Sequence, residues 1–594
     1  MIEQSLLLLT GREKWRFVLL LISVITVSVA QVLGVGSIIP LMDVLSNPDD
    51  IGDQAFVNFV TDRIELRDST AVVMFLSVLA FVALVGSNAL ISLNTWFSYR
   101  FVWSVQTRLS TDILHSYLRH PYEQTLNRNP AHVEKNVLEE AVVFTNGVLR
   151  PILRFISSML VVSMLVVFLV WYEPKIAAIS IAVIGSGYVI SFLLLKNSLA
   201  RAGSRRTESN EQRFKAAAEA LGGLKEIQIL GYQQEFVSRY SRPTGIYAKA
   251  TAHQNLVTEL PRYIIEVLAF GTLLIAAYVV ASTRNDLNEV APTLSVFAIA
   301  AYRIVPAMQR AFSDWGSIRF NSPVVEPLYA AKVTALSADL DRPNTASNLT
   351  FEKSISICDG SYAYPGSQET VLQDINLEIS RGETVAFIGR TGSGKTTLAE
   401  MLIGLLTPSS GQVRIDDALL DQSTLRSWQD IVGYVPQDIY LIDDTVSANI
   451  AFGINQDEIY QEAVEMAAKN ANIHEFIKNS LPYGYSTMVG DRGVRLSGGQ
   501  RQRIGIARAL YQSPKVLLLD EATSNLDHKT EQVLHQTLED ISRDLTVVMI
   551  AHRLNTTRIA DRIYQLENGR IARQGSYEEI VESGDVGDSL VRGN

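Results

Sequence analysis

Six long apolar stretches occupy the first half of the chain, each near the roughly 20 residues that a helix needs to cross a bilayer. They lie at Phe17–Met42, Thr70–Leu93, Ile152–Tyr172, Ile176–Leu195, Tyr263–Ala281 and Val290–Val305. The connections Asn94–Pro151 and Lys196–Arg262 are long and polar, with a helical pattern. We therefore expect six transmembrane helices, and the two long connections should extend membrane helices into the cytoplasm.

The pattern changes after a segment rich in Ser, Asn, Asp and Pro at Ala335–Leu349, which predicts a linker. From Phe351 onward, short apolar strands alternate with helices, as in a mainly parallel α/β sheet. The predicted fold class is therefore a membrane α-helical domain over residues 1–335, a linker over 336–350 and an α/β domain over 351–594.

Composition agrees with this division, because 47% of the 594 residues are hydrophobic and only 19% are charged. That balance favours membrane spans joined to a globular part. The net charge of −10 argues against a nucleic-acid partner, which would require a basic face. A single cysteine, Cys358, allows no intramolecular disulfide, and the first apolar run is too long for a signal-peptide core.

Charge predicts the orientation of the spans. Basic residues precede the first span and fill the second connection, whereas the first connection between spans is acidic. By the positive-inside rule, the N-terminus, the long connections and the α/β domain are cytoplasmic. Each long connection should turn at a short helix seated on that domain, at Pro121–Val133 and Gly222–Gly231, although solvated loops would fit these residues too. An external amphipathic helix is expected around Phe56–Ile64.

The α/β domain begins with a phosphate-binding motif. Gly389-Arg390-Thr391-Gly392-Ser393-Gly394-Lys395-Thr396 fits G-x-x-x-x-G-K-[ST], between an apolar strand and a helix that Thr397 can open. Glycines let backbone N–H groups surround phosphates, and the helix N-terminus adds its positive dipole end. Lys395 would reach the outer phosphates, and the Thr396 hydroxyl would hold Mg²⁺.

A second motif, Leu496-Ser497-Gly498-Gly499-Gln500, is followed by an apolar strand that ends in Asp520-Glu521. With these motifs the chain resembles an ATP-binding cassette (ABC) transporter of the exporter type. The resemblance implies ATP and Mg²⁺ as cofactors, Asp520 and Gln437 as Mg²⁺ ligands and Glu521 as general base. It also implies that His552 contacts the γ-phosphate and that Tyr364 stacks on adenine. Asn525 and Asp491 stand where the family more often has Ala and Glu.

The chain holds one membrane domain and one cassette. In the family, the signature motif of one cassette completes the phosphate site of another, so the resemblance implies a homodimer with two composite ATP sites. In each site, the residues that act on the phosphates in one chain would face Ser497 and Gly499 of its partner; they are Lys395, Thr396, Gln437, Asp520, Glu521 and His552. Thr397, Gly498 and Gln500 are further candidate ATP-binding residues of the same motifs.

Arginines in or beside the apolar spans are the candidate substrate residues, because ionisable groups in a membrane are costly. Arg303 and Arg310 are seven residues apart and share one helix face, and Arg262 begins the fifth span. A basic stripe in a cavity suits phosphate or pyrophosphate. Two other interpretations stay open: Arg262 pairs with Glu266, or these arginines extend to the membrane interface.

The surroundings of these arginines, Pro261-Arg262-Tyr263 and Ala301-Tyr302-Arg303-Ile304-Val305-Pro306, resemble the bacterial flippases for lipid-linked oligosaccharides in protein N-glycosylation. That resemblance implies ATP-driven flipping of a polyprenyl-pyrophosphate glycan across the bacterial inner membrane. Gly86-Ser87-Asn88 departs from it, because the family's basic belt draws an arginine from the second span.

Three other functions are to be compared with these residues. An exporter of a lipid A-like glycolipid, peptide or drug is the alternative within the same class. A cassette ATPase acting on chromosomes or ribosomes conflicts with six apolar spans and an acidic balance. A regulator that binds ATP without hydrolysing it conflicts with Glu521 and His552.

Overall fold

The computed structural model describes residues 2–37, 40–41, 44, 69–126, 130–283, 290–340, 349–367, 369–490, 493–521, 536, 539, 545–551 and 554–582. The chain forms two compact units, residues 1–119 with 128–338 and residues 120–127 with 339–594. The short segment 120–127 thus belongs to the second unit, although long helices of the first flank it in sequence. The predicted external helix around Phe56–Ile64 lies outside the described residues.

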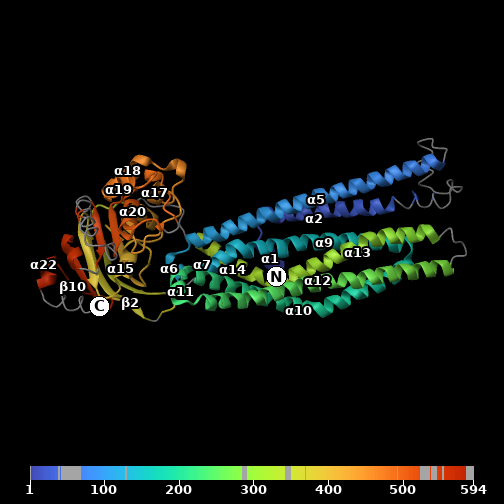
Figure 1. Ribbon diagram of the computed structural model, residues 1–594, viewed down its shortest axis with the longest axis horizontal. Coiled ribbons are helices and arrows are strands. Elements are labelled where there is room, and N and C mark those ends of the chain that lie inside the picture. The colour runs from blue at the N-terminus through green and yellow to red at the C-terminus, as the bar shows by residue number, and fades with distance from the viewer. Residues whose placement is uncertain are drawn as a thin grey trace. The chain divides into compact units, whose positions relative to one another are not determined.

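The membrane unit is a bundle of long helices (Figure 1). Its principal helices are α2 (Gly11–Gly36), α5 (Ser69–Arg119), α9 (Arg150–Tyr172), α10 (Pro174–Gly222), α12 (Gln233–Thr283) and α13 (Val290–Asn321). In the part of the chain that the structure describes, four helices are long and apolar enough to cross a membrane: Gly11–Gly34, Thr70–Arg119, Ala131–Tyr172 and Pro174–Gly222. The fifth and sixth predicted stretches lie in α12 and α13, and the count of six spans stays a prediction.

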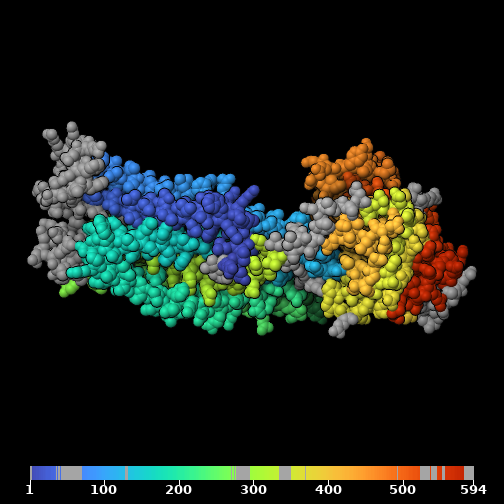
Figure 2. Space-filling model, turned by 180° about the vertical axis from the view of Figure 1, so that it is seen from behind, coloured from blue at the N-terminus to red at the C-terminus, as the bar shows by residue number. Residues whose placement is uncertain are grey.

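Packing in this unit leaves apolar side chains on the outside. Helix α2 packs on α5 and α9, α9 packs on α13, and α12 packs on α10 and α13. Figure 2 shows α2 in dark blue along one side of the unit, beside the turquoise surface of α9. Met74, Phe81 and Leu194 are about 70% exposed. Such a surface suits hydrocarbon rather than water.

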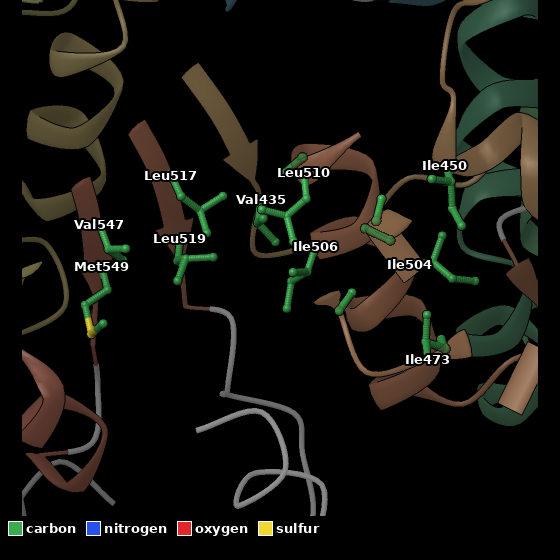
Figure 3. Packing of buried hydrophobic residues seen from close by; sticks show 14 of the residues in the cluster. Val435, Ile450, Ile473, Ile504, Ile506, Leu510, Leu517, Leu519, Val547 and Met549 are labelled. Carbon is green, nitrogen blue, oxygen red and sulfur yellow. The ribbon is translucent and has the colours of Figure 1, made fainter. Parts of the chain in front are cut away.

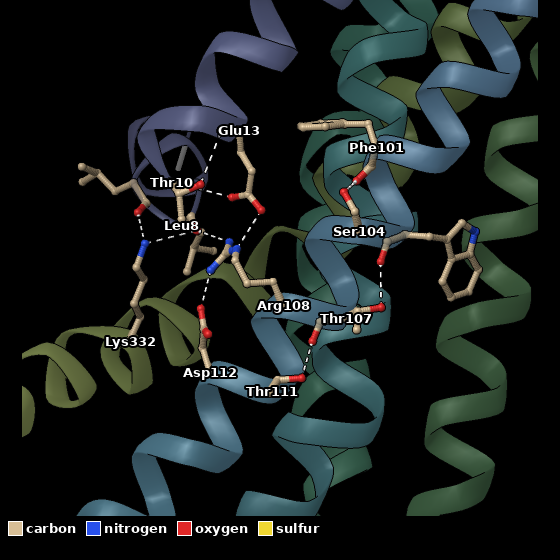
Figure 4. Close-up of polar contacts among 12 residues, drawn as sticks. Leu8, Thr10, Glu13, Phe101, Ser104, Thr107, Arg108, Thr111, Asp112 and Lys332 are labelled. Atoms are coloured by element: carbon tan, nitrogen blue, oxygen red, sulfur yellow. Dashed lines mark hydrogen bonds and ion pairs between the residues drawn. The ribbon is translucent and has the colours of Figure 1, made fainter.

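A polar cluster joins the short helix α1 (Ile2–Leu7) to α2, α5 and α14 (Val325–Leu340), as Figure 4 shows. Arg108 pairs with Glu13 at 2.7 Å and donates to the Leu8 carbonyl at 2.9 Å, and Lys332 donates to the Leu7 carbonyl at 2.7 Å. These cations satisfy carbonyls that the end of α1 leaves free. Glu13 also accepts from the Thr10 backbone N–H at 2.8 Å, which forms the capping box that starts α2.

The chain that leads into α9 is helical throughout but contains two π-helical segments. Its order is α7 (Pro130–Lys135), η2 (Asn136–Glu140), α8 (Ala141–Phe144), η3 (Thr145–Leu149) and then α9, in which η2 and η3 are the π segments. A π segment disturbs the regular α-helical ladder, and neighbouring hydroxyls bond carbonyls in both segments. Ser110 donates to the Val137 carbonyl at 2.9 Å, and Ser317 donates to the Gly147 carbonyl at 3.0 Å. These bonds fix the phase of the helix where α9 begins.

Both predicted turns of the long connections contain short helices, α6 (Tyr122–Leu126) and α11 (Leu224–Leu230). Helix α6 groups with the second unit, and its Glu123 carboxylate accepts a hydrogen bond from the Thr407 backbone N–H. Helix α11 groups with the first unit. Helix α14 continues to Leu340, past the start of the predicted linker, and the boundary of the first unit lies at residue 338.

The second unit contains two sheets rather than one. A six-stranded sheet has the order β10-β9-β3-β8-β7-β6, parallel from β9 to β6, and a four-stranded antiparallel sheet has the order β2-β1-β4-β5. The strands are β1 (Ser354–Ala363), β2 (Thr370–Ser380), β3 (Thr384–Gly389), β4 (Ser410–Ile415), β5 (Ala418–Leu419), β6 (Val432–Val435), β7 (Val516–Asp520), β8 (Thr546–Ile550), β9 (Arg562–Glu567) and β10 (Arg570–Gly575). The mainly parallel sheet is therefore confirmed, with an antiparallel edge strand and a second sheet that the sequence pattern did not reveal.

Helices cover the parallel sheet and build a helical layer beside it. They are α15 (Lys395–Leu402), α16 (Leu425–Gln429), α17 (Val446–Ile450), α18 (Gln461–Asn470), α19 (His474–Ser480), α20 (Gly498–Leu510) and α22 (Tyr577–Glu582). Figure 3 shows one buried cluster in which Ile506 of α20 lies toward Leu519 of β7, while Ile504, on the other side of α20, lies beside Ile473. This core fixes the N-terminus of α20 relative to the sheet.

Candidate nucleotide site and membrane cavity

The parallel strands bring the cassette motifs to one edge of the sheet. Strand β7 ends at Asp520, which pairs in register with Ile550 of β8, and Phe387 of β3 pairs with the same residue. Gly389 and Gln437 follow at the same ends of β3 and β6. Ligands bind at the carboxyl ends of strands in such sheets, so this edge is the candidate nucleotide site.

The phosphate loop has the backbone that its glycines permit. Gly389, Gly392 and Gly394 have φ angles of 150°, 83° and 98°, in the region that favours glycine. Lys395 donates from Nζ to the Gly389 and Arg390 carbonyls at 2.9 and 3.1 Å. Burial lowers the pKa of Lys395, while the carboxylates of Glu521 and Asp520 act in the opposite direction. The loop thus carries a cation at the base of a backbone cradle.

The start of α15 presents hydroxyls on two sides. Thr396 is exposed, as a Mg²⁺ ligand needs to be. Thr397 is buried, and its hydroxyl lies 3.0 Å from the Tyr364 hydroxyl. The Tyr364 ring meets Tyr362 edge-on, with ring centroids 5.1 Å apart. The aromatic residue predicted to stack on adenine is therefore joined directly to the phosphate-loop helix.

The two acidic residues have different surroundings. Asp520 is buried at the end of β7. Glu521 has a φ of 48° and accepts a 2.6 Å hydrogen bond from Gln437 Nε2. The structure thus brings Gln437 and Glu521 into direct contact, so the two residues predicted to act on Mg²⁺ and water form one polar unit.

The signature motif begins α20. Ser497 is the N-cap: its hydroxyl accepts from the Gln500 N–H at 3.3 Å, while Gln500 Oε1 accepts from the Ser497 N–H at 2.8 Å. This capping box leaves other N–H groups of the first turn available at the positive end of the helix dipole. Gly498 and Gly499 occupy that turn.

Arg508 is a structural residue that the sequence analysis missed. It lies on α20 and donates to the Tyr440 and Asn449 carbonyls at 2.8 Å, so it ties the segment after Gln437 to the signature helix. Burial lowers the pKa of Arg508 to about 10. Nothing in its sequence context marked it, because its partners, two backbone carbonyls and the Asn449 side-chain oxygen, are far away in the chain.

Three predicted contacts of the cassette fall outside the described residues. They are His552, Asp491 and the segment around Asn525.

The membrane unit contains a basic cavity of about 490 Å³ between α2, α5, α9 and α13. Arg303 and Arg310 both line it, as their spacing predicted. Arg150 and Arg154 of α9 line it too, so four arginines of the described chain meet there. Uncharged polar residues complete the lining, including Gln31, Asn88, Asn94, Ser157 and Tyr302.

Arg150 and Arg154 were missed, although the signal that found Arg303 and Arg310 was present. The two are four residues apart at the start of the third span, which places them on one helix face. Arg262, in contrast, is exposed on α12 and does not line this cavity. Within one chain, two of the three arginines predicted to bind the substrate, Arg303 and Arg310, therefore line the same cavity.

Comparison with known proteins agrees with both units. Residues 16–303 match the family model described as the ABC transporter transmembrane region, and residues 372–524 match the model described as ABC transporter. The chain is 30% identical over 472 residues to an ATP-dependent lipid A-core flippase of Alkalilimnicola ehrlichii, covering 78% of this chain and 79% of that protein.

Two further relatives are informative. The chain is 38% identical over 312 residues to ABC transporter B family member 29, chloroplastic, of Arabidopsis thaliana, and the match spans 52% of this chain and 48% of that protein. A bacterial Atm1-family ABC exporter with ATP bound has the same fold, with a TM-score of 0.76 and 21% identity over 98% of this chain and 97% of that one. The chain therefore belongs to the ABC transporter family, as an ATP-hydrolysing half-transporter of the exporter type.

Proposed function

We propose that this exporter flips a phosphate-bearing glycolipid from the cytoplasmic to the outer leaflet of a bacterial inner membrane. Two copies would act together, and the signature motif of each would complete the phosphate site of the other. ATP would then hold the cassettes together, and hydrolysis would release them.

Within each ATP site the residues have complementary roles. The phosphate loop and Lys395 bind the phosphates, and Thr396 and Asp520 fit the oxygen ligands that Mg²⁺ prefers. Bound Mg²⁺ neutralises charge that develops on the phosphates. Glu521 orients and activates the attacking water, and its 2.6 Å bond to Gln437 fixes the direction of its carboxylate. His552 is proposed to contact the γ-phosphate.

The basic cavity carries the substrate assignment. Guanidinium groups bind phosphate oxygens through paired N–H donors, and four of them around one cavity favour an anionic ligand. Arg150, Arg154, Arg303 and Arg310 meet this condition, and the uncharged polar lining provides partners for sugar hydroxyls.

An apolar groove supports an amphipathic substrate. The groove lies between α2 and α9, which also line the basic cavity, and has a volume of about 460 Å³. Its lining includes Leu33, Met164, Val167, Phe168 and Trp171, which come later in both helices than the residues that line the basic cavity. With the N-terminus in the cytoplasm, the groove lies on the outer side, where hydrocarbon chains fit.

Two phosphate-bearing glycolipids compete as substrate. The motifs around Arg262 and Arg303 favour a polyprenyl-pyrophosphate oligosaccharide, and a lipid A-like glycolipid is the alternative. Relatives named lipid A-core flippases match most of this chain, so they support the alternative better. We therefore propose a lipid A-like glycolipid, in which phosphates on a sugar core carry the charge.

The test is ATP-dependent translocation in proteoliposomes, with a fluorescent bisphosphorylated lipid A-type glycolipid and a polyprenyl-pyrophosphate oligosaccharide in parallel. We expect the first to be flipped, and Glu521→Gln protein to flip neither. Translocation of the oligosaccharide alone would reverse the choice of substrate. Failure with both lipids despite ATPase activity would refute a phosphate-bearing glycolipid substrate.

Arginine variants add a matched comparison. Arg303→Leu and Arg310→Leu remove charges that line the cavity, whereas Arg262→Leu removes one from outside it. Translocation should fall strongly in the first two and remain near the wild-type rate in the third. Equal effects in all three would contradict the assignment of this cavity.

A further inference from the structure

A buried carboxylate lies directly behind one of the cavity arginines. Asp314 is on α13, and its side chain is 0% exposed. Its Oδ1 accepts hydrogen bonds from Nε of Arg154, at 3.0 Å, and from a second guanidinium nitrogen of the same residue. Arg154 itself is 49% exposed and lines the cavity. Asp314 can therefore influence a ligand only through Arg154 and through its charge.

The spacing on α13 explains this arrangement. Arg303, Arg310 and Asp314 follow one another at intervals of seven and four residues, which keeps them on one helix face. Ser317, three residues later, donates to the Gly147 carbonyl in η3. The same face of α13 thus lines the cavity with arginines and then anchors the segment from which Arg150 and Arg154 project.

Asp314 also affects the other cavity charges. Asp314 interacts electrostatically with Arg150 and Arg310 as well as with Arg154. Arg310 in turn is repelled by the charges of Arg154 and Arg303. The second oxygen of Asp314, Oδ2, has no hydrogen-bond partner among the described residues. A buried carboxylate is costly unless nearby cations balance it. Here it offsets one of the four guanidinium charges and leaves the remaining positive charge for a ligand.

We propose that Asp314 is a positioning residue that orients Arg154 and limits the positive charge of the headgroup site, so that it determines how many phosphate charges the exporter accepts. Its bonds to Nε and one terminal nitrogen hold the guanidinium plane and leave other N–H donors for the cavity. Because its carboxylate repels an incoming phosphate, it weakens binding enough for release. This inference rests on the proposed function.

The test compares Asp314→Asn, which keeps the shape and an acceptor oxygen, with Asp314→Glu, which keeps the charge. KM and kcat of lipid-stimulated ATPase are measured on the full-length protein in nanodiscs, with bisphosphorylated and monophosphorylated lipid A-type glycolipids. In Asp314→Asn we expect KM to fall about fivefold, more for the bisphosphorylated lipid, and kcat to fall with it, because one repulsive charge is gone. In Asp314→Glu both constants should stay closer to wild type.

A residue that only tied α9 to α13 would give a different result. Its loss would lower the temperature of unfolding and raise KM for both lipids alike, and that outcome would overturn the inference. So would an unchanged KM in Asp314→Asn, or the same change in Asp314→Glu. If neither lipid stimulated the wild-type ATPase, the proposed function would fail and this inference with it, which distinguishes the two failures.

Discussion

The hydrogen bond between Gln437 and Glu521 joins two cassette residues that are far apart in sequence. We expect Glu521→Gln to lower ATP hydrolysis about 100- to 10,000-fold, because an amide cannot take a proton from the attacking water. ATP binding should persist, since the phosphate loop is unchanged. Steady-state ATPase assays measure the loss of hydrolysis, and nucleotide-binding measurements on the same protein test whether ATP still binds. Near-normal hydrolysis would contradict the role of Glu521 as general base.

Glu400 gives the cassette a pH dependence. Burial, with a smaller contribution from the charge of Asp520, raises the pKa of this α15 carboxyl to about 7 in the nucleotide-free protein. The folded state therefore favours the protonated form. Its contribution to stability is fully present below about pH 4.5, the ordinary pKa, and is lost as the pH rises through about 7.

The measurement is thermal unfolding of the nucleotide-free protein between pH 5 and 8, for wild type and Glu400→Gln. The stability of Glu400→Gln should decline less than that of wild type as the pH rises across this range. Glu369→Gln, at an exposed position, is the matched control and should follow wild type. Parallel curves for wild type and Glu400→Gln would show that Glu400 does not titrate in this window.

Individual residues were predictable to different extents. The cassette residues sit in short motifs whose spacing is fixed by a strand, a loop and a helix, so Lys395, Asp520 and Ser497 could be found from sequence. The cavity arginines come from two helices, and only those on α13 were found. Asp314 could not be assigned, because its partner Arg154 is 160 residues away and only the packing of α9 on α13 brings them together.

Among the elements, the long apolar stretches predicted helices well because hydrophobic length is a strong signal. The helical extensions in α5 and α10 also followed from their pattern. The π segments η2 and η3 did not, since the hydroxyls that support them come from Ser110 on α5 and Ser317 on α13. The four-stranded antiparallel sheet was missed for a similar reason: its strands pair across distant segments.

Gly147 tests the packing of η3. A Cβ at this position would lie 2.6 Å from the Asn321 side chain, whereas a Cβ at Gly185, in α10, would meet nothing within 4 Å. We expect Gly147→Ala to destabilise the membrane unit by about 1–3 kcal/mol through overpacking. Gly185→Ala should be neutral or stabilising, because alanine favours helix. Thermal unfolding in detergent compares the two, and equal stability would contradict the close contact.

For the whole molecule, this chain carries one membrane domain and one cassette, so the proposed composite ATP site requires a second cassette. Lys395→Ala disables the phosphate loop, and a bulky Ser497→Arg disables the signature. Each variant alone should be inactive. Co-assembly of the two should restore ATPase activity, because one of the two sites in a mixed dimer pairs an intact loop with an intact signature.

ATPase assays of co-expressed, differently tagged chains measure this complementation. Co-expression of Lys395→Ala with Glu521→Gln is the matched control, because every site would then carry a damaged phosphate-loop side. Activity that failed to return in the first mixture, with mixed dimers present, would show that the two motifs do not act across chains.

The π segments have a consequence for how this helix tolerates change in length. A π turn holds one residue more than an α turn and keeps the helix on either side of it in phase. Deleting one residue within Asn136–Glu140 would therefore convert that turn to an ordinary α-helix and leave Arg150 and Arg154 at the cavity. Deleting one residue from the regular helix α8 would instead turn the residues that follow by about 100°. The position of a lost residue, as much as its identity, thus determines which side chains line the cavity.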